Sequence, residues 1–304
     1  MSETEAELAR ELFDPDFLGR LRALFFKLRK RRRLQRKGLQ QTISSGFSRE
    51  FKDHRPYAVG EDFRAIDWRL YARLEKLFVR VFEEVQEFHV HILLDRSLSM
   101  ASPYPAKRLL ALRLSVALAY LALVSQHTVS IHSLAGDLKR ETPPRKGQGH
   151  IHEILRQMAA LPFAGTTNLS QSLARFRPGR ARRGIVFLIS DLLGGSSPNA
   201  GELAELAARW PAETHVIHVL DPLERCPVAE GELLMEDVET GERRRIWLTK
   251  RELDAYAASF QSFIDELDQS CSARQINYAL WNTGQPFEEM FLDLLSRGSA
   301  LAGG

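Results

Sequence analysis

Two short stretches of sequence decide the fold class: His89-Val-His-Ile-Leu-Leu-Asp95 and Gly184-Ile-Val-Phe-Leu-Ile-Ser-Asp191. Each is apolar along nearly its whole length, rather than at every second position, and each ends in an aspartate. An apolar run of this length is typical of a strand that is buried on both faces, as in a parallel sheet covered by helices. We therefore predict that the two stretches are central strands of such a sheet.

Helix and strand patterns alternate around these two strands. The predicted helices lie at 106–126, 150–161, 169–176, 200–210, 250–274 and 286–297. Further strands are predicted at 127–135, 213–220 and 276–281, with a looser strand and turn through 149 and a hairpin at 233–248. This order predicts an α/β fold, with a Rossmann-like, mainly parallel sheet and helices on both faces.

Composition and pattern divide the chain into three segments. Residues 1–45 are predicted to form a basic helical segment and its connector. Residues 46–88 are dense in charged and aromatic side chains, include a predicted strand at 77–82, and are expected to dock on the main domain at 89–304. Five charged residues can form the docking ion pairs: Arg55, Asp62, Arg64, Asp67 and Arg73. Direct recognition of a partner is the alternative role of this segment.

The net charge of +3 combines two unlike regions. Between Arg20 and Lys37 ten residues are basic and none is acidic, whereas the rest of the chain has 32 basic and 39 acidic residues, a net charge of −7. Apolar residues recur at helical spacing beside the basic ones: Leu18, Leu21, Phe25 and Leu28. The segment is either a solvated face of a docked helix or a binding surface. An anionic membrane or a protein groove suits its apolar stripe better than nucleic acid does.

Composition excludes several other classes of protein. A hydrophobic content of 44% provides for a sizeable core, which argues against a disordered chain. The two cysteines, Cys226 and Cys271, form no paired motif, which argues against a disulfide framework or a cysteine zinc site. The acidic N-terminus has no apolar run, which argues against a signal peptide. The longest apolar stretch, 109–124, is interrupted by Arg113 and is too short to span a bilayer. We expect a cytoplasmic protein, with a peripheral position at the inner membrane face as the alternative.

Oxygen-bearing side chains gather where the predicted central strands end. Asp95 ends the first strand, Ser97 and Ser99 follow it, and Asp191 ends the second strand. A glycine turn between the strands presents Thr167 just before a helix. Ligands of parallel sheets bind at the carboxyl ends of the strands. Because carboxylates and hydroxyls are hard ligands, the set suits Mg²⁺, Mn²⁺ or Ca²⁺ rather than zinc.

In this order the residues resemble the metal-ion-dependent adhesion site (MIDAS) of von Willebrand factor A domains. The resemblance implies a von Willebrand factor A-like fold. It also implies that Asp95, Ser97, Ser99 and Thr167 surround the ion, with Asp191 in or near the shell through water. An open coordination position would then take an acidic group from a protein partner.

The preceding segment is similar to the bacterial family called "domain of unknown function 58", which couples such a segment to an A-type domain. The similarity rests on Phe51-x-x-x-Arg55-x-Tyr57, Gly60-Glu61-Asp62-x-Arg64-x-Ile66-Asp67-Trp68, Ala72-Arg73 and Val79-Arg80-x-Phe82-Glu83-Glu84. Members are often encoded beside MoxR-type AAA+ ATPases. The resemblance therefore implies such an ATPase as partner, in the assembly or activation of other proteins.

Motifs of three enzyme classes are missing from the sequence. Ser97 stands where a phosphatase with an aspartyl nucleophile has its second acid, and neither a Gly-x-Ser-x-Gly elbow nor a phosphate-binding P-loop occurs. The pairs His89/His91 and His150/His152 have metal-ligand spacing, but nothing nearby completes a shell. We expect a non-enzymatic, metal-binding interaction or adaptor protein. The alternatives are a metal-dependent phosphoesterase that uses the same pocket, and a membrane-surface or nucleic-acid tether.

Overall fold

The computed structural model describes residues 16–17, 19–23, 49–58, 60–84, 87–166, 168–179, 184–193, 199–228, 230–238 and 240–297. The chain divides into two compact units. The larger, here called the sheet unit, comprises Met1–Gln35 and Phe88–Gly303, and the smaller, the ribbon unit, comprises Arg36–Glu87. The two units are built on separate sheets.

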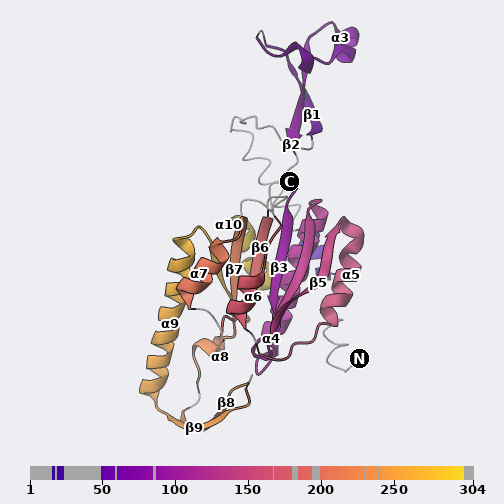
Figure 1. The fold of residues 1–304 in the computed structure, drawn as a ribbon. Coiled ribbons are helices and arrows are strands. Elements are labelled where there is room, and N and C mark those ends of the chain that lie inside the picture. Colours follow the sequence, from indigo (N-terminus) through magenta and orange to yellow (C-terminus); the bar gives the residue numbers. More distant parts are fainter. Residues whose placement is uncertain are drawn as a thin grey trace. The chain divides into compact units, whose positions relative to one another are not determined.

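A six-stranded sheet forms the centre of the sheet unit, with the strand order β10-β7-β6-β3-β4-β5 (Figure 1). Its strands are β3 (His89–Asp95), β4 (Thr128–Ala135), β5 (Asp137–Lys146), β6 (Gly184–Ser190), β7 (Ala212–Leu220) and β10 (Asn277–Asn282). Neighbouring strands run parallel except β4 and β5, which are antiparallel. The predicted central strands are therefore confirmed: β3 and β6 lie side by side in the middle of the sheet.

Helices cover both faces of this sheet (Figure 1). Each face has its own apolar core. The first core includes α4 (Pro105–Val124), α5 (Ile151–Ala159) and α10 (Phe287–Arg297), and the second includes α6 (Leu169–Arg175), α7 (Ala200–Ala208) and α9 (Lys250–Ser272). Ile92 of β3 faces the first core and Leu93 faces the second. Because alternate residues enter different cores, the strand needs apolar residues at every position. The predicted α/β fold class is confirmed.

Most predicted elements occur with ends shifted by one or a few residues. The predicted hairpin is the antiparallel pair β8 (Gly231–Glu236) and β9 (Arg243–Leu248). Among the described strands and α-helices, three are not predicted by the sequence pattern: β1 (Arg49–Pro56), α3 (Trp68–Leu74) and α8 (Pro222–Arg225). The first lacks apolar alternation because most of its residues are charged, and the last is a single turn, too short to show a helical period.

The described residues of the basic N-terminal segment are helical and contribute to the first core of the sheet unit. Phe17 and Leu21 are buried, and the Phe17 ring meets the Phe287 ring edge-on, with 5.4 Å between centroids. Arg20 forms an ion pair with Glu288 at 3.2 Å. Most of the ten basic residues, the rest of the predicted apolar stripe and the connector lie outside the described residues. In the described part of the chain, no helix has both the length and the hydropathy needed to cross a bilayer.

The ribbon unit is built on the antiparallel pair of β1 and β2 (Phe78–Glu84). Asp67 caps α3 by accepting backbone N–H groups of its first turn, and Asp62 caps a short helical turn in the same way. Arg55 pairs with Glu61 at 2.6 Å. These three predicted docking residues thus have partners within the ribbon unit, and docking itself stays a prediction. Three large apolar side chains of α3 are exposed: Trp68, Tyr71 and Leu74.

Three histidines of the sheet converge on one hydroxyl group. Ring nitrogens of His89, His91 and His132 lie 3.1, 3.0 and 3.3 Å from Ser130 Oγ. Burial and then the neighbouring histidines lower the pKa of His91 to about 3, and burial with the positive charge of Arg140 lowers the pKa of His132 to about 4. Among the described residues, no group of three or more His, Cys, Asp or Glu is arranged to hold a metal ion.

These buried histidines should make the fold sensitive to acid. Their folded pKa values lie below the ordinary value of 6.5, so the unfolded chain takes up protons first as the pH falls below 6.5. The free energy of unfolding should therefore decline from pH 6.5 toward pH 4. At pH 5 the expected loss is about 2 kcal/mol for each of His91 and His132. Urea unfolding at pH 7 and pH 5 measures it.

A pair of variants identifies the source of this acid sensitivity. His91→Leu/His132→Leu should lose much of the pH dependence, because leucine carries no titrating group. His152→Gln, at an exposed position of α5, is the matched control and should keep it. An equal fall in stability in the wild type and in the double variant would show that the cluster is not its source.

Candidate functional site

The register of the two central strands brings Asp95 and Ser190 together. Leu94 of β3 pairs with Ile189 of β6, so the next residue of each strand lies at the carboxyl edge of the sheet. The Ser190 hydroxyl donates a hydrogen bond to Asp95 Oδ2 at 2.6 Å, and both side chains are buried. This bond fixes the Asp95 carboxylate at the point where β3 ends.

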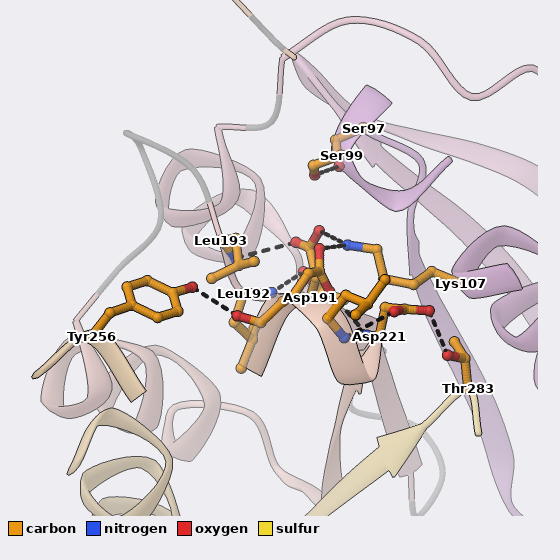
Figure 2. Close-up of polar contacts among 12 residues, drawn as sticks. Ser97, Ser99, Lys107, Asp191, Leu192, Leu193, Asp221, Tyr256 and Thr283 are labelled. Atoms are coloured by element: carbon orange, nitrogen blue, oxygen red, sulfur yellow. Dashed lines mark hydrogen bonds and ion pairs between the residues drawn. The ribbon is translucent and has the colours of Figure 1, made fainter. Parts of the chain in front are cut away.

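The loop after β3 presents two hydroxyl groups beside this carboxylate. The Ser97 N–H donates to Asp95 Oδ1 at 3.0 Å, and a short helix, η3 (Leu98–Met100), follows. The Oγ atoms of Ser97 and Ser99 are 2.9 Å apart, and Figure 2 shows the two hydroxyls facing each other. Neighbouring ligands of an octahedral Mg²⁺ with bonds of about 2.0–2.1 Å are separated by about 2.9 Å. The pair therefore fits two adjacent positions of such a shell.

The predicted glycine turn lies beside this loop. Gly165 has a φ of 82°, in the left-handed region that favours glycine, and its carbonyl accepts the N–H of Leu98 at 3.1 Å. The Thr166 carbonyl accepts the N–H of Gly136 at 2.8 Å. The turn is thus tied both to the serine loop and to the end of β4. Thr167 lies outside the described residues, and its role as a ligand stays a prediction.

Hydrogen bonds from backbone N–H groups to side-chain oxygens hold the end of β6 in a sharp turn. Asp191 is fully buried, and its Oδ1 accepts the N–H of Leu193 at 3.1 Å. The Leu192 N–H donates to Ser190 Oγ at 2.9 Å. Leu192 has a φ of 55°, a left-handed conformation that leucine seldom adopts. The turn directs the second carboxylate oxygen of Asp191 toward Lys107 (Figure 2).

The structure adds a site residue that the sequence pattern does not mark: Lys107, in the first turn of α4. Its side chain is fully buried, with Nζ 2.9 Å from Asp191 Oδ2 and also in contact with Glu224. Burial acts to lower the pKa of Lys107, but the two carboxylates outweigh it and hold the pKa above its ordinary value. Burial raises the pKa of Glu224, against the opposite effect of Lys107. A single ammonium group is therefore shared by two carboxyl groups.

The single-turn helix α8 places Glu224 in this contact. Asp221-Pro-Leu-Glu224 has the sequence of a capping box with proline at the first helical position, which is a signal for this turn. Asp221 Oδ1 accepts the N–H of Leu223 at 3.0 Å, and Glu224 Oε2 accepts the N–H of Asp221 at 3.0 Å. The Tyr256 hydroxyl of α9 donates to the Glu224 carbonyl, and the Thr283 hydroxyl donates to Asp221 Oδ2 (Figure 2). Glu224 is thus held from several directions.

Three predicted ligands lie together at the end of β3: Asp95, Ser97 and Ser99. Asp191 ends the adjacent strand, where Lys107 pairs with it. Lys107 contacts Asp191 and Glu224, and Asp95 lies at the end of the neighbouring strand. When these four groups are all ionised, their net charge is −2. Excess buried negative charge beside hydroxyl oxygens fits a hard divalent cation. The residues present therefore fit the metal that the sequence motif implies.

A family model described as "Protein of unknown function DUF58" matches residues 53–262. The chain belongs to this family. The matched residues begin in β1 of the ribbon unit and continue through the sheet unit into α9. Every predicted ligand lies inside the match, and so do Lys107 and Glu224, which makes the site part of the DUF58 region.

Similar proteins were found in sequence and in structure. "Uncharacterized protein Rv1480" of Mycobacterium tuberculosis is 27% identical over 239 residues, which cover 77% of this chain and 74% of the relative. The conserved hypothetical protein BatB of Bacteroides thetaiotaomicron has a TM-score of 0.43 at 15% identity, over 71% of this chain and 100% of that chain. A von Willebrand factor type A protein of Catenulispora acidiphila has a TM-score of 0.43 at 14% identity, over 71% of this chain and 43% of that chain.

The bond between Ser190 and Asp95 should contribute measurably to stability. Ser190→Ala leaves a buried carboxylate oxygen without this donor and the Leu192 N–H without its acceptor. We expect the free energy of unfolding to fall by about 1–3 kcal/mol, measured by urea denaturation. Ser115→Ala is the matched control: its hydroxyl is also buried, but donates to a carbonyl of its own helix. The control should change stability by less than about 1 kcal/mol. Equal effects of the two substitutions would contradict the expectation.

Proposed function

We propose that this DUF58 protein is a non-enzymatic adaptor that binds a divalent cation and uses it to hold an acidic group of a protein partner. The proposed ligands are Asp95, Ser97, Ser99 and Thr167, with Asp191 in or near the shell through water. Mg²⁺ is the expected ion, with Mn²⁺ or Ca²⁺ as substitutes. The observation that carries the proposal is the 2.9 Å pair of serine hydroxyls beside a buried, fixed carboxylate. When bound, the ion would supply a Lewis-acid contact for the partner's carboxylate.

The chain's own residues support a preorganised site. The Ser97 N–H and the Ser190 hydroxyl hold the two oxygens of Asp95, so this carboxylate needs little rearrangement to face a ligand. The bond between Leu98 and Gly165 keeps the serine loop beside the turn that carries Thr167. A site whose groups are already ordered loses less conformational entropy on binding. These features favour specific binding at the carboxyl edge of the sheet.

The arrangement of the carboxylates favours binding over proton transfer. Asp95 accepts hydrogen bonds from a backbone N–H and a hydroxyl, and Asp191 and Glu224 both contact the ammonium group of Lys107. A general acid or base has to exchange a proton near neutral pH at the reacting group. Carboxylates held in this way are better suited to setting the charge and shape of a site. An adaptor is therefore preferred to the phosphoesterase alternative.

The proposed partner is a MoxR-type AAA+ ATPase, in the assembly or activation of other proteins. This assignment rests on the family resemblance, and the site would accept an acidic side chain of that partner. The proposed compartment is the cytoplasm, which suits two free cysteines, an exposed Cys226 and a buried Cys271. The described part of the basic segment uses Phe17 and Leu21 to pack on the sheet unit, so these side chains do not support a membrane tether.

Removal of the two hydroxyl ligands should weaken cation binding. For Ser97→Ala/Ser99→Ala we expect the affinity for Mn²⁺ to fall by about tenfold or more, because neutral oxygen ligands are lost without a change in charge. Electron paramagnetic resonance of free Mn²⁺ measures the affinity directly. Ser262→Ala, an exposed serine of α9, is the control. The same affinity in all three proteins would exclude the serine pair as ligands.

Partner binding should depend on the cation. In a pull-down with a purified MoxR-type ATPase, EDTA should release the partner and excess Mg²⁺ should restore it. Asp95→Ala/Ser97→Ala should not retain the partner under either condition, because the bridging ion is lost. Retention of the ATPase in EDTA would argue against a metal-bridged contact. Mg²⁺-dependent turnover of a phosphoester that Asp95→Ala abolishes would establish the hydrolase alternative instead.

A further inference from the structure

Lys107 places a fixed positive charge inside a cluster of carboxylates at the proposed cation site. Its side chain is fully buried and contacts Asp191, which follows β6, and Glu224, which lies in α8. The lysine sits in the first turn of α4, and this helix is buried along most of its length. Neither the helix nor its ammonium group can move away without exposing apolar surface or separating a buried ion pair. The positive charge is therefore a permanent part of the site.

Glu224 is the second carboxyl group in contact with the Lys107 ammonium. Glu224 is not one of the predicted ligands. Its carboxyl group contacts Lys107 and also accepts the N–H of Asp221, which caps α8. Tyr256 holds its carbonyl from α9 at 2.8 Å. Charges in a poorly hydrated environment interact over several ångströms with little screening. Lys107 should therefore oppose a nearby dication, whereas Glu224 should favour it, although neither is a ligand.

We propose that Lys107 and Glu224 are positioning residues that set the divalent-cation affinity of this site in opposite directions. The ammonium keeps Asp191 charge-compensated, which limits the strength with which the site holds a cation by itself. When the cation is bound, a site in which Lys107 compensates the charge of Asp191 attracts the partner's carboxylate more strongly than a site in which Asp191 is uncompensated. The inference rests on the proposed function, and it identifies the charge balance of the site as the regulator of cation affinity.

The test compares the wild type, Lys107→Met, Glu224→Gln and the double variant. These four proteins differ in the summed charge at positions 95, 191, 224 and 107. With these groups ionised, the net charge of the four positions is −2 in the wild type, −3 in Lys107→Met, −1 in Glu224→Gln and −2 in the double variant. We expect the affinity for Mn²⁺ to rise about tenfold in Lys107→Met and to fall about tenfold in Glu224→Gln. The double variant should lie within about threefold of the wild type. Free Mn²⁺ measured by electron paramagnetic resonance gives all four affinities.

Arg113→Met is the matched control, because it removes a positive charge from the same helix about 9 Å farther along its axis. It should leave the Mn²⁺ affinity unchanged. Circular dichroism and thermal melting establish that each variant is folded. If Lys107→Met does not fold, Glu224→Gln still carries the test against the wild type, since its Mn²⁺ affinity is expected to be about tenfold lower.

The outcomes separate this inference from the function on which it rests. Binding in the wild type with the same affinity in Lys107→Met and Glu224→Gln would overturn the inference and leave the cation site intact. Absence of Mn²⁺ binding in every protein would overturn the proposed function and the inference with it. Binding only in Lys107→Met would support the inference, because it would show that the lysine charge opposes the cation, while contradicting cation binding by the native site.

Discussion

Burial of β3 and β6 on both faces is the constraint on which the rest of the sheet unit depends. Helices cover each face, so polar side chains on these strands are confined mainly to their ends. The parallel register then brings both carboxyl ends to one edge, where Ser190 donates to Asp95 and Asp191 follows directly. The same packing that stabilises the fold therefore concentrates oxygen ligands at one place. The site is a consequence of sheet topology as much as of its own sequence motif.

The buried ion pairs of Lys107 are a costly way to stabilise a protein. Removing charges from water carries a penalty that their attraction barely offsets, and apolar residues of similar size often serve stability as well or better. Their value here is positional: Lys107 joins the start of α4 to the ends of β6 and β7 through Asp191 and Glu224. An apolar contact would join the same elements without fixing the direction of a carboxylate. Charge is therefore used to orient groups at the edge of the sheet.

The sequence predicts those parts of the molecule that depend on local pattern. The run 89–95 becomes β3 with the predicted ends, and Asp95, Ser97 and Ser99 meet because they are neighbours in the chain. Lys107 is different, since it lies 84 residues from Asp191 and 117 from Glu224. A lysine at the start of an apolar helix is expected to extend into solvent, and only the tertiary fold shows that Lys107 is buried. The α8 turn lacks periodicity, although its capping-box sequence marks it.

Glu224 also links the site to a hairpin with exposed apolar side chains. The chain leaves it at the end of α8, forms the β8–β9 hairpin, and returns in α9, where Tyr256 donates to the Glu224 carbonyl. The segment between α8 and α9 therefore starts next to Glu224 and is tied back to the same residue through Tyr256. Its hairpin exposes Leu234, Met235 and Trp247. A two-stranded hairpin is marginally stable by itself, so its geometry depends strongly on such anchors. The residue that pairs with Lys107 thus also supplies, through its backbone carbonyl, the contact that ties the return of this segment to α8.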